Sequence, residues 1–365
     1  MFEESVKSPI SRKKYIYLVK LFMKYHKIKN FDDVIKINKD ELQSLVETYV
    51  IYLKKSISPN TVPAYLVPIS TFLEVNYIDL NWKKIKRLYP QKIKRSGASA
   101  YQTEDVKLIL DATPQLRNRA LIHFLASTGM RVGAVSNLTL GHLRDMPHGC
   151  TMVLFYEDST EEYHTFLTPE ATKALQLYLD ERKNHGETLS DESPIFRERY
   201  QIASLKPKSL STETIQGVLA RSMKNANIRG QKKNGRYSEQ LVHGFRKRFN
   251  TILKLNNSVN DNAIEKMMGH KKGLDGSYLQ ITIERLFEEF VKGIPELTID
   301  DSKRKQFEID KINNEKTELQ KKVDQINQMQ NDMKKMQFRY HEAKNQPISD
   351  DDLERLVKKM KKLDS

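Results

Sequence analysis

The sequence predicts a mainly helical protein of the α or α+β class, and three features of its 365 residues point to this class. First, apolar residues recur every three or four positions in most segments, which is the period of a helix. Second, only residues 150–167 have a strand-rich pattern, with a polar turn in the middle. Third, the composition changes after Asp300 to Lys, Glu, Gln, Asn and Met, as in a long exposed helix. We therefore expect a helical N-terminal domain, a middle domain with a small β-hairpin or sheet, and a long C-terminal helix or weak coiled coil.

The composition limits the function classes. The hydrophobic fraction of 38% is enough to build cores, so the chain is not a disordered polyelectrolyte. The single cysteine, Cys150, excludes an internal disulfide, and the absence of a CxxC pair leads us to expect no metal. Residues 1–4 lack the basic start of a signal peptide, and the apolar stretches are too short to span a bilayer. We expect a cytoplasmic protein with no membrane association and no cofactor.

Positive charge is concentrated in two zones. The chain has 62 Lys plus Arg against 47 Asp plus Glu, for a net charge of +15. Residues 1–100 contribute 19 basic and 9 acidic residues, and residues 201–250 contribute 11 basic residues against Glu213 and Glu239. Two separated basic zones could contact a long polyanion from two sides, and nucleic acid is the usual partner of such a protein. The alternative is a surface that is merely kept soluble by its charge.

Residues 1–89 predict a domain of short amphipathic helices. A polar start at Asn38 opens the second helix, and Ser58-Pro59-Asn60 ends it. The expected helices are residues 11–25, 38–55, 61–75 and 82–88. Residues 90–100 are small, polar and basic, and we interpret them as an extended linker able to follow a phosphate backbone.

Residues 101–298 predict a second domain, which begins with an acidic helix start at Thr103 and is closed by Pro295. Two strands, at residues 150–155 and 162–167, are expected to form a hairpin. The expected helices are residues 103–112, 115–127, 132–138, 169–184, 211–226, 238–255, 260–268 and 280–292.

Residues 299–365 predict a helical tail with seven-residue periodicity. One heptad position is apolar and comprises Ile312, Leu319, Ile326, Met333 and Tyr340. The other is mixed and comprises Ile309, Lys316, Val323, Gln330 and Gln337. This pattern favours a weak coiled coil or a single solvated helix. A last short helix is expected at residues 350–363.

Two motifs place basic side chains where an anion could bind. In Ser127-Thr128-Gly129-Met130-Arg131, a glycine turn delivers Arg131 to the start of a new helix. In His243-Gly244-Phe245-Arg246, the first and last residues share a helix face and could contact one phosphate. Each motif alone is weak, since most such arginines are surface residues and most such histidines are structural.

A third motif completes a recognisable order. Gly269 is expected to end a helix, which exposes His270 on the following turn, and Tyr278 comes eight residues later. Such a tyrosine is by itself as easily a packing residue. Together, however, Arg131, His243-x-x-Arg246, Gly269-His270 and Tyr278 resemble the signature of the tyrosine recombinases, the phage-type integrases and their relatives. The resemblance covers roughly residues 1–295, and the Lys-rich style is similar to that of archaeal and archaeal-virus integrases.

The resemblance implies a site-specific DNA recombinase of a mobile genetic element, associated with the nucleoid. Residues 1–89 would be a core-binding, DNA-binding domain, and residues 101–298 would be the catalytic domain. Tyr278 would attack the scissile phosphodiester and leave a 3′-phosphotyrosyl link and a free 5′-hydroxyl. The expected substrate is double-stranded DNA, and the expected assembly is a homotetramer on paired sites. Because the covalent bond conserves the energy of the phosphodiester, neither ATP nor a metal is required.

The same resemblance assigns the supporting roles. Arg131 and Arg246 would hold the non-bridging phosphate oxygens, His243 would accept the proton of Tyr278, and His270 would donate a hydrogen bond to the phosphate. A phenol with a pKa near 10 needs such a cationic pocket and proton acceptor. The further residues expected to contact DNA are Lys83, Lys84, Lys92, Lys94, Arg95, Lys247 and Arg248.

The sequence departs from the family in three places, one of which is a slightly short gap between the histidine and the tyrosine. Residues 131–172 contain no lysine, although the family usually has one in the hairpin to protonate the leaving 5′-oxygen. The candidate replacements are His164, Lys206 and Lys208. Ala134 occupies a position where the family tends to have an acid. Two alternatives therefore stay open: a catalytically impaired architectural DNA-binding protein, and a type IB topoisomerase with the same phosphotyrosine chemistry.

Overall fold

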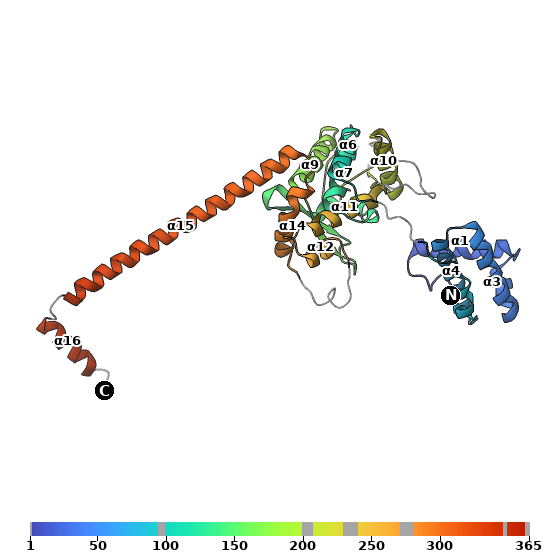
Figure 1. Cartoon of the computed structure of the whole chain (residues 1–365), viewed down its shortest axis with the longest axis horizontal. Helices are drawn as coiled ribbons and strands as arrows, with labels where there is room; N and C mark the ends of the chain where they lie inside the picture. The colour runs from blue at the N-terminus through green and yellow to red at the C-terminus, as the bar shows by residue number, and fades with distance from the viewer. Residues whose placement is uncertain are drawn as a thin grey trace. The chain divides into compact units, whose positions relative to one another are not determined.

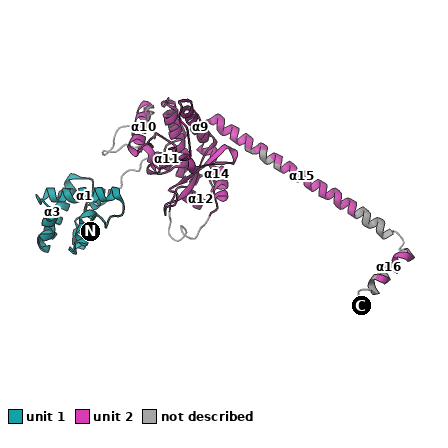
Figure 2. Cartoon of the chain, turned by 180° about the vertical axis from the view of Figure 1, so that it is seen from behind, with its two compact units in different colours: residues 1–96 teal, residues 97–365 magenta. Residues whose placement is uncertain are grey.

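The computed structural model describes residues 2–93, 99–198, 207–228, 240–270, 281–345 and 349–361. It divides the chain into two compact units, Met1–Ser96 and Gly97–Ser365 (Figure 2). Helices dominate both units, and the second also contains a small antiparallel sheet (Figure 1). This architecture confirms the predicted fold class. No helix in the described ranges has the length and apolar character needed to cross a membrane.

The first unit is a helical bundle around an apolar core. Its helices are α1 (Pro9–Tyr25), α2 (Phe31–Lys36), α3 (Lys39–Ser56), α4 (Val62–Val75) and α5 (Trp82–Arg87), with a short 3-10 turn, η1 (Pro59–Thr61). The side chain of Asn38 accepts the main-chain N–H of Glu41 and so caps α3, as the polar start predicted. Helix α2 was missed because it has six residues and buries only Val34, which is too little to show a period.

The second unit is built around α7, which is buried along most of its length. Its helices before the tail are α6 (Thr103–Asp111), α7 (Leu116–Thr128), α8 (Val132–Val135), α9 (Pro169–Asn184), α10 (Thr212–Asn225), α11 (Leu241–Leu255), α12 (Asp261–Met267) and α14 (Ile283–Leu297). Helices α9 and α11 both pack against α7. The segment that ends in Gly129 is therefore held from two sides.

The sheet has the order β1-β2-β3 and is antiparallel throughout. Its strands are β1 (Leu143–Met146), β2 (Cys150–Phe155) and β3 (Tyr163–Leu167), with short 3-10 turns η2 (Leu140–His142) and η3 (Pro147–Gly149) beside β1. Met152 pairs with Phe166, which confirms the predicted hairpin. Val153 joins the core that contains α7 and α9, whereas Phe166 joins a second core with α11, α12 and α14. The four-residue strand β1 was not predicted, since its two middle residues are exposed and it is too short to alternate.

The tail begins directly after the second core. Helix α14 continues through Pro295 to Leu297, two residues past the proline that was expected to close the domain. The buried carboxylate of Glu170 accepts the main-chain N–H groups of Ile299 (2.8 Å) and Asp300 (3.3 Å). These bonds fix the start of α15 (Asp301–Asn345), which is followed by α16 (Asp350–Lys361).

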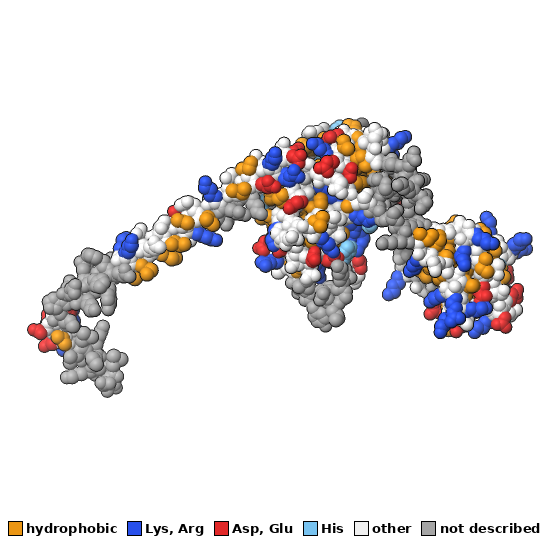
Figure 3. All heavy atoms as spheres, viewed as in Figure 1, with side chains coloured by type: hydrophobic (Ala, Val, Ile, Leu, Met, Phe, Trp, Pro, Cys, Tyr) orange, Lys and Arg blue, Asp and Glu red, His pale blue; other side chains and the backbone are white. Residues whose placement is uncertain are grey.

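The apolar heptad position of α15 is exposed to solvent. Ile312, Leu319, Ile326 and Met333 all lie on the surface, and apolar side chains follow the helix in the space-filling view (Figure 3). Within the described residues, none of these four side chains joins a buried core. The coiled coil therefore stays a prediction.

Candidate active site

The site is formed where two helices end in glycine turns. Helix α7 ends at Gly129 (φ 56°), and α12 is followed by Gly269 (φ 62°), both in the left-handed region. A Cβ at Gly129 would lie 2.6 Å from the Cβ of Phe249, and one at Gly269 would lie 2.6 Å from the ring of Tyr163. Both turns therefore need glycine for conformation and for space. The carbonyl oxygens of Gly129 and Met268, at the C-terminal ends of α7 and α12, both face the same side chain.

This side chain is Arg246 of α11. Its Nη1 donates to the carbonyl oxygen of Gly129 (2.8 Å), and its Nη2 donates to the carbonyl oxygen of Met268 (2.7 Å). The same Nη2 lies 2.7 Å from Nε2 of His270. Arg246 is only 7% exposed. One guanidinium thus joins the ends of α7 and α12 and positions the histidine.

Arg131 adds a second positive charge at the edge of this pocket. It is the N-cap of α8, it is exposed, and its Nη2 donates to the carbonyl oxygen of Gly269 (3.1 Å). Burial lowers the pKa of Arg246, and the charge of Arg131 lowers it further. Among the described residues, no carboxylate forms an ion pair with either arginine. We call the surroundings of Arg131, Arg246 and His270 the pocket. In the described part of the chain its two guanidinium groups have no carboxylate bonded to them, an arrangement suited to an anion.

His243 lies one helical turn before Arg246 and is exposed. Burial lowers the pKa of its imidazole, and Lys247 and Arg246 lower it further. A lowered pKa keeps more of the imidazole neutral at pH 7, so His243 can accept a proton. Phe245 and Phe249 of the same helix are buried.

Glu265 is part of the site and was missed by the sequence reasoning. It is 8% exposed, and its carboxylate binds Nδ1 of His270 (Oε2, 2.6 Å) and Nζ of Lys254 (Oε1, 2.5 Å). The main-chain N–H of His270 donates back to the carbonyl oxygen of Glu265 (2.9 Å), as in a Schellman turn. The available signal was an acid five residues before a histidine that follows a helix-ending glycine. Helical spacing of three or four residues does not detect this pair.

The structure does not bring any candidate for the general acid or the nucleophile that it describes into contact with Arg246. Tyr278 and Lys206 lie outside the described residues. His164 of β3 follows Tyr163, whose ring contacts Gly269, and successive strand residues point to opposite faces. The charged groups that act on His164 are Glu162 and Arg144, so the structure does not bring it into the pocket. Lys208 is exposed, and the described residues show no contact between it and Arg246.

The residues predicted to contact DNA differ in their exposure to solvent. Lys94 and Arg95 lie outside the described residues. Lys83 and Lys92 are exposed, and Lys247 is half-buried. Lys84 is exposed but forms an ion pair with Glu47 (2.9 Å), which neutralises much of its charge.

The prediction for Arg248 was wrong. Its side chain is 0% exposed, and its Nη atoms donate to the carbonyl oxygens of Glu296 and Leu297 and to Oγ1 of Thr103. Residues two apart on a helix point to different sides, so Arg246 faces the pocket while Arg248 faces the end of α14. Arg248 is a structural residue without a surface for DNA.

Comparison with known proteins adds independent information. Residues 100–274 match the model described as the phage integrase family. Tyrosine recombinase XerC of Caldanaerobacter subterraneus subsp. tengcongensis is 23% identical over 287 residues, which cover 72% of this chain and 75% of the relative. Tyrosine recombinase XerA of Thermococcus kodakarensis is 27% identical over 207 residues, which cover 55% of this chain and 64% of the relative.

Solved structures share the fold. The Tn1549 transposon integrase in complex with transposon right end DNA is 15% identical, with a TM-score of 0.51, covering 77% of this chain and 93% of that one. The XerH recombinase in a post-cleavage complex with difH substrate is 17% identical, with a TM-score of 0.50, covering 72% and 74%. The order of motifs, the fold and the family match agree. Residues 100–274 therefore carry a domain of the phage integrase family, and the chain is similar to tyrosine recombinases, an enzyme class of DNA strand transferases.

Proposed function

We propose that this chain is a site-specific DNA recombinase that cuts and rejoins double-stranded DNA through a 3′-phosphotyrosyl intermediate at Tyr278. One observation carries the proposal: Arg131 and Arg246 lie at a pocket beside His270, where the described residues offer them carbonyl oxygens and an imidazole as partners. A phosphodiester is the anion that would complete this pocket. Its non-bridging oxygens gain negative charge in the phosphorane transition state, where guanidinium groups stabilise it most.

In the proposed reaction, residues of this chain accept and supply every proton that is transferred. The phenolic oxygen of Tyr278 attacks phosphorus, the bond to the 5′-oxygen breaks, and the phenolic proton passes to His243. The lowered pKa of His243 supports this role because the neutral imidazole is the proton acceptor. The leaving 5′-oxygen must gain a proton, and we assign it to Lys206 or Lys208 since His164 points away from the pocket. Rejoining is the reverse, with a 5′-hydroxyl as the attacking group.

We further propose that the protein acts as a homo-oligomer, with a tetramer on paired DNA sites. The exposed heptad position of α15 supports this assembly, because an apolar row of this length on a helix is expected to pair. The XerH and Tn1549 structures were obtained with DNA, in agreement with DNA as the partner of this fold.

The test is covalent trapping on a nicked suicide substrate that carries the DNA flanking this gene. Wild type should form an SDS-resistant protein–DNA adduct, and Tyr278→Phe should not. If neither protein forms an adduct on the cognate site while both bind it, the enzyme proposal is lost in favour of an architectural protein. Relaxation of any supercoiled plasmid, irrespective of sequence, would instead indicate a topoisomerase.

A further inference from the structure

The hydrogen bonds around His270 fix which ring nitrogen carries the proton. A guanidinium has only N–H donors, so Nε2 of His270 accepts from Nη2 of Arg246 at 2.7 Å. The ionised carboxylate of Glu265 has only acceptors, so Nδ1 of His270 carries a hydrogen and donates to Oε2 at 2.6 Å. In the DNA-free protein, His270 is thus held as the Nδ1–H tautomer.

This arrangement does not allow His270 to donate a hydrogen bond to a phosphate. A phosphate oxygen is an acceptor, so a histidine that meets it through Nε2 needs a hydrogen on that atom. The hydrogen on Nδ1 cannot move there by a change of tautomer, because Glu265 would then face a lone pair at 2.6 Å. Only the imidazolium, with hydrogens on both nitrogens, satisfies Glu265 and a phosphate together.

We propose that Glu265 is a positioning residue for strand transfer, which holds His270 by Nδ1 so that Nε2 faces the scissile phosphate and takes up a solvent proton when DNA binds. This inference rests on the proposed function. The bound phosphate would replace the contact between Nε2 and Arg246, and His270 would become the third cation of the pocket. The carboxylate makes this possible because it stabilises the charged ring.

The surroundings of Glu265 fit this role. Lys254 holds the other carboxylate oxygen at 2.5 Å, which fixes the position of the Glu265 side chain. The described charged groups around His270 are Glu265 from α12, Arg246 and Lys254 from α11, and Arg131, which reaches the adjacent Gly269 carbonyl. Within the described ranges, Glu265 thus supplies a carboxylate beside the pocket in a chain that has Ala134 at the position of the family's usual acid.

The experiment compares Glu265→Gln with a matched control, Glu289→Gln. Glu289 is also 8% exposed, binds a lysine (Lys292, 2.6 Å) and accepts a main-chain N–H at the start of α12 (Asn260, 2.8 Å), but does not contact His270. Adduct formation on the suicide substrate is timed at pH 6 and pH 8.5, together with DNA affinity and melting temperature in the full chain.

Glu265→Gln should slow adduct formation roughly ten- to a hundredfold at pH 8.5, the range expected for one charge-assisted hydrogen bond. The loss should shrink at pH 6, where solution protons supply the imidazolium, while DNA affinity changes little. Glu289→Gln should cleave like wild type at both pH values. Equal losses at pH 6 and pH 8.5, or no loss at all, would overturn the proposal.

Glu265→Gln could also lower the melting temperature, so a double-mutant cycle combines it with His270→Gln. Because Glu265 acts through His270, the substitution should add no further loss of cleavage to His270→Gln. Additive losses would mean that Glu265 acts by another route. An inactive wild type would instead defeat the proposed function, whereas an active wild type with an unaffected Glu265→Gln would defeat only this inference.

Discussion

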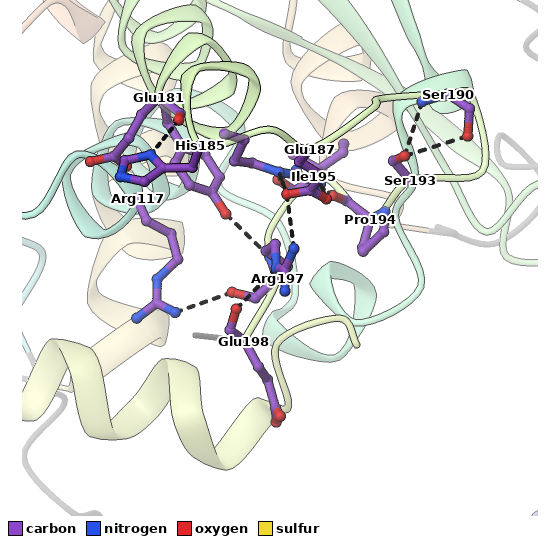
Figure 4. A network of polar contacts seen from close by, with 12 residues as sticks. Arg117, Glu181, His185, Glu187, Ser190, Ser193, Pro194, Ile195, Arg197 and Glu198 are labelled. Carbon is purple, nitrogen blue, oxygen red and sulfur yellow. Dashed lines mark hydrogen bonds and ion pairs between the residues drawn. The ribbon is translucent and has the colours of Figure 1, made fainter. Parts of the chain in front are cut away.

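Two arginine-rich clusters in the second unit show what distinguishes a structural network from a reactive site. In the first, Arg182 and Arg197 both bind the carboxylate of Glu187, at 2.6 and 2.9 Å. Figure 4 shows Arg197 beside Glu187 in this network. In the second, Arg131 and Arg246 bind carbonyl oxygens and an imidazole. Both clusters contain a buried guanidinium group, but among the described residues a carboxylate bonds directly to the arginines of the first cluster and not to those of the second.

The difference lies in the charge balance. Burial alone would raise the pKa of Glu187, but hydrogen bonds from Arg182 and Arg197 outweigh it and lower the pKa. This carboxylate is therefore an internal partner that stabilises the fold. At the Arg131–Arg246 pocket, the described carboxylate of Glu265 reaches Arg246 only through His270, so an anion can still bind the two guanidinium groups directly. An unbalanced cationic cluster thus indicates a function more strongly than a count of arginines does.

The largest expected effect comes from removing one of the two unbalanced charges. Arg131→Ala should lower the rate of adduct formation by about 10³-fold, because the transition-state charge loses one guanidinium. Arg131 is exposed and has a single carbonyl contact, so stability should change little. Single-turnover cleavage of the suicide substrate measures the rate, and thermal melting is the control. A loss smaller than tenfold would contradict the assignment of this pocket to phosphate.

Breaking the balanced cluster should affect folding and leave chemistry intact. Glu187→Ala removes the carboxylate that both buried guanidinium groups bind and should cost about 3 kcal/mol of unfolding free energy, measured in urea. The folded variant should still cleave at the wild-type rate. Since the folded pKa of Glu187 lies below its ordinary 4.5, its contribution is complete above that pH and is lost as the pH falls through the folded value. The difference between the two proteins should therefore shrink in acid.

Arg248 tests the same distinction within one helix. Arg248→Met removes a buried side chain that binds the end of α14, and should cost about 2 kcal/mol because carbonyl acceptors lose their donor. DNA affinity of the folded protein should equal that of wild type, as measured by fluorescence anisotropy. A several-fold weaker affinity would show that this residue reaches DNA after all.

A smaller effect is expected from neutralising single exposed lysines of the first unit. Each phosphate contact adds about 0.9 to the slope of log affinity against log salt. Lys83→Gln should lower this slope by up to that amount, and Lys84→Gln by less, because Glu47 already neutralises Lys84. Titrations at four salt concentrations compare the two variants. Equal slopes for wild type and Lys83→Gln would exclude Lys83 as a phosphate contact.

The smallest effect on chemistry is expected from shortening the tail. Truncation after Asp310 keeps the contacts of Ile299 and Asp300 with Glu170 and removes the heptad residues from Ile312 onward. Cleavage of a single site should stay at the wild-type rate, while the mass of the complex on paired sites should fall. Mass photometry with and without DNA measures this. An unchanged mass would mean that α15 does not join protomers.

The sequence predicted the helices that have a clear apolar period and the three motifs that meet in the site. It missed α2 and β1, which are too short for a period, and it misassigned Arg248 because a run of basic letters does not show which side chains face inward. Glu265 escaped notice because its pairing with His270 depends on a turn rather than on helical spacing. Sequence-based prediction fails where the function of a side chain depends on whether it points into the core or toward the site.

By itself, the sequence determined the fold class, the resemblance to a family and the presence of Arg131, Arg246 and His270, since residue type and spacing are local properties. Only the tertiary structure decided which charges are left unbalanced. Arg246 and Arg248 are chemically identical and two residues apart. Arg246 lines the pocket, whereas Arg248 is buried and binds the end of α14. Charge balance depends on contacts between segments far apart in the chain, and only the packed fold brings those segments together.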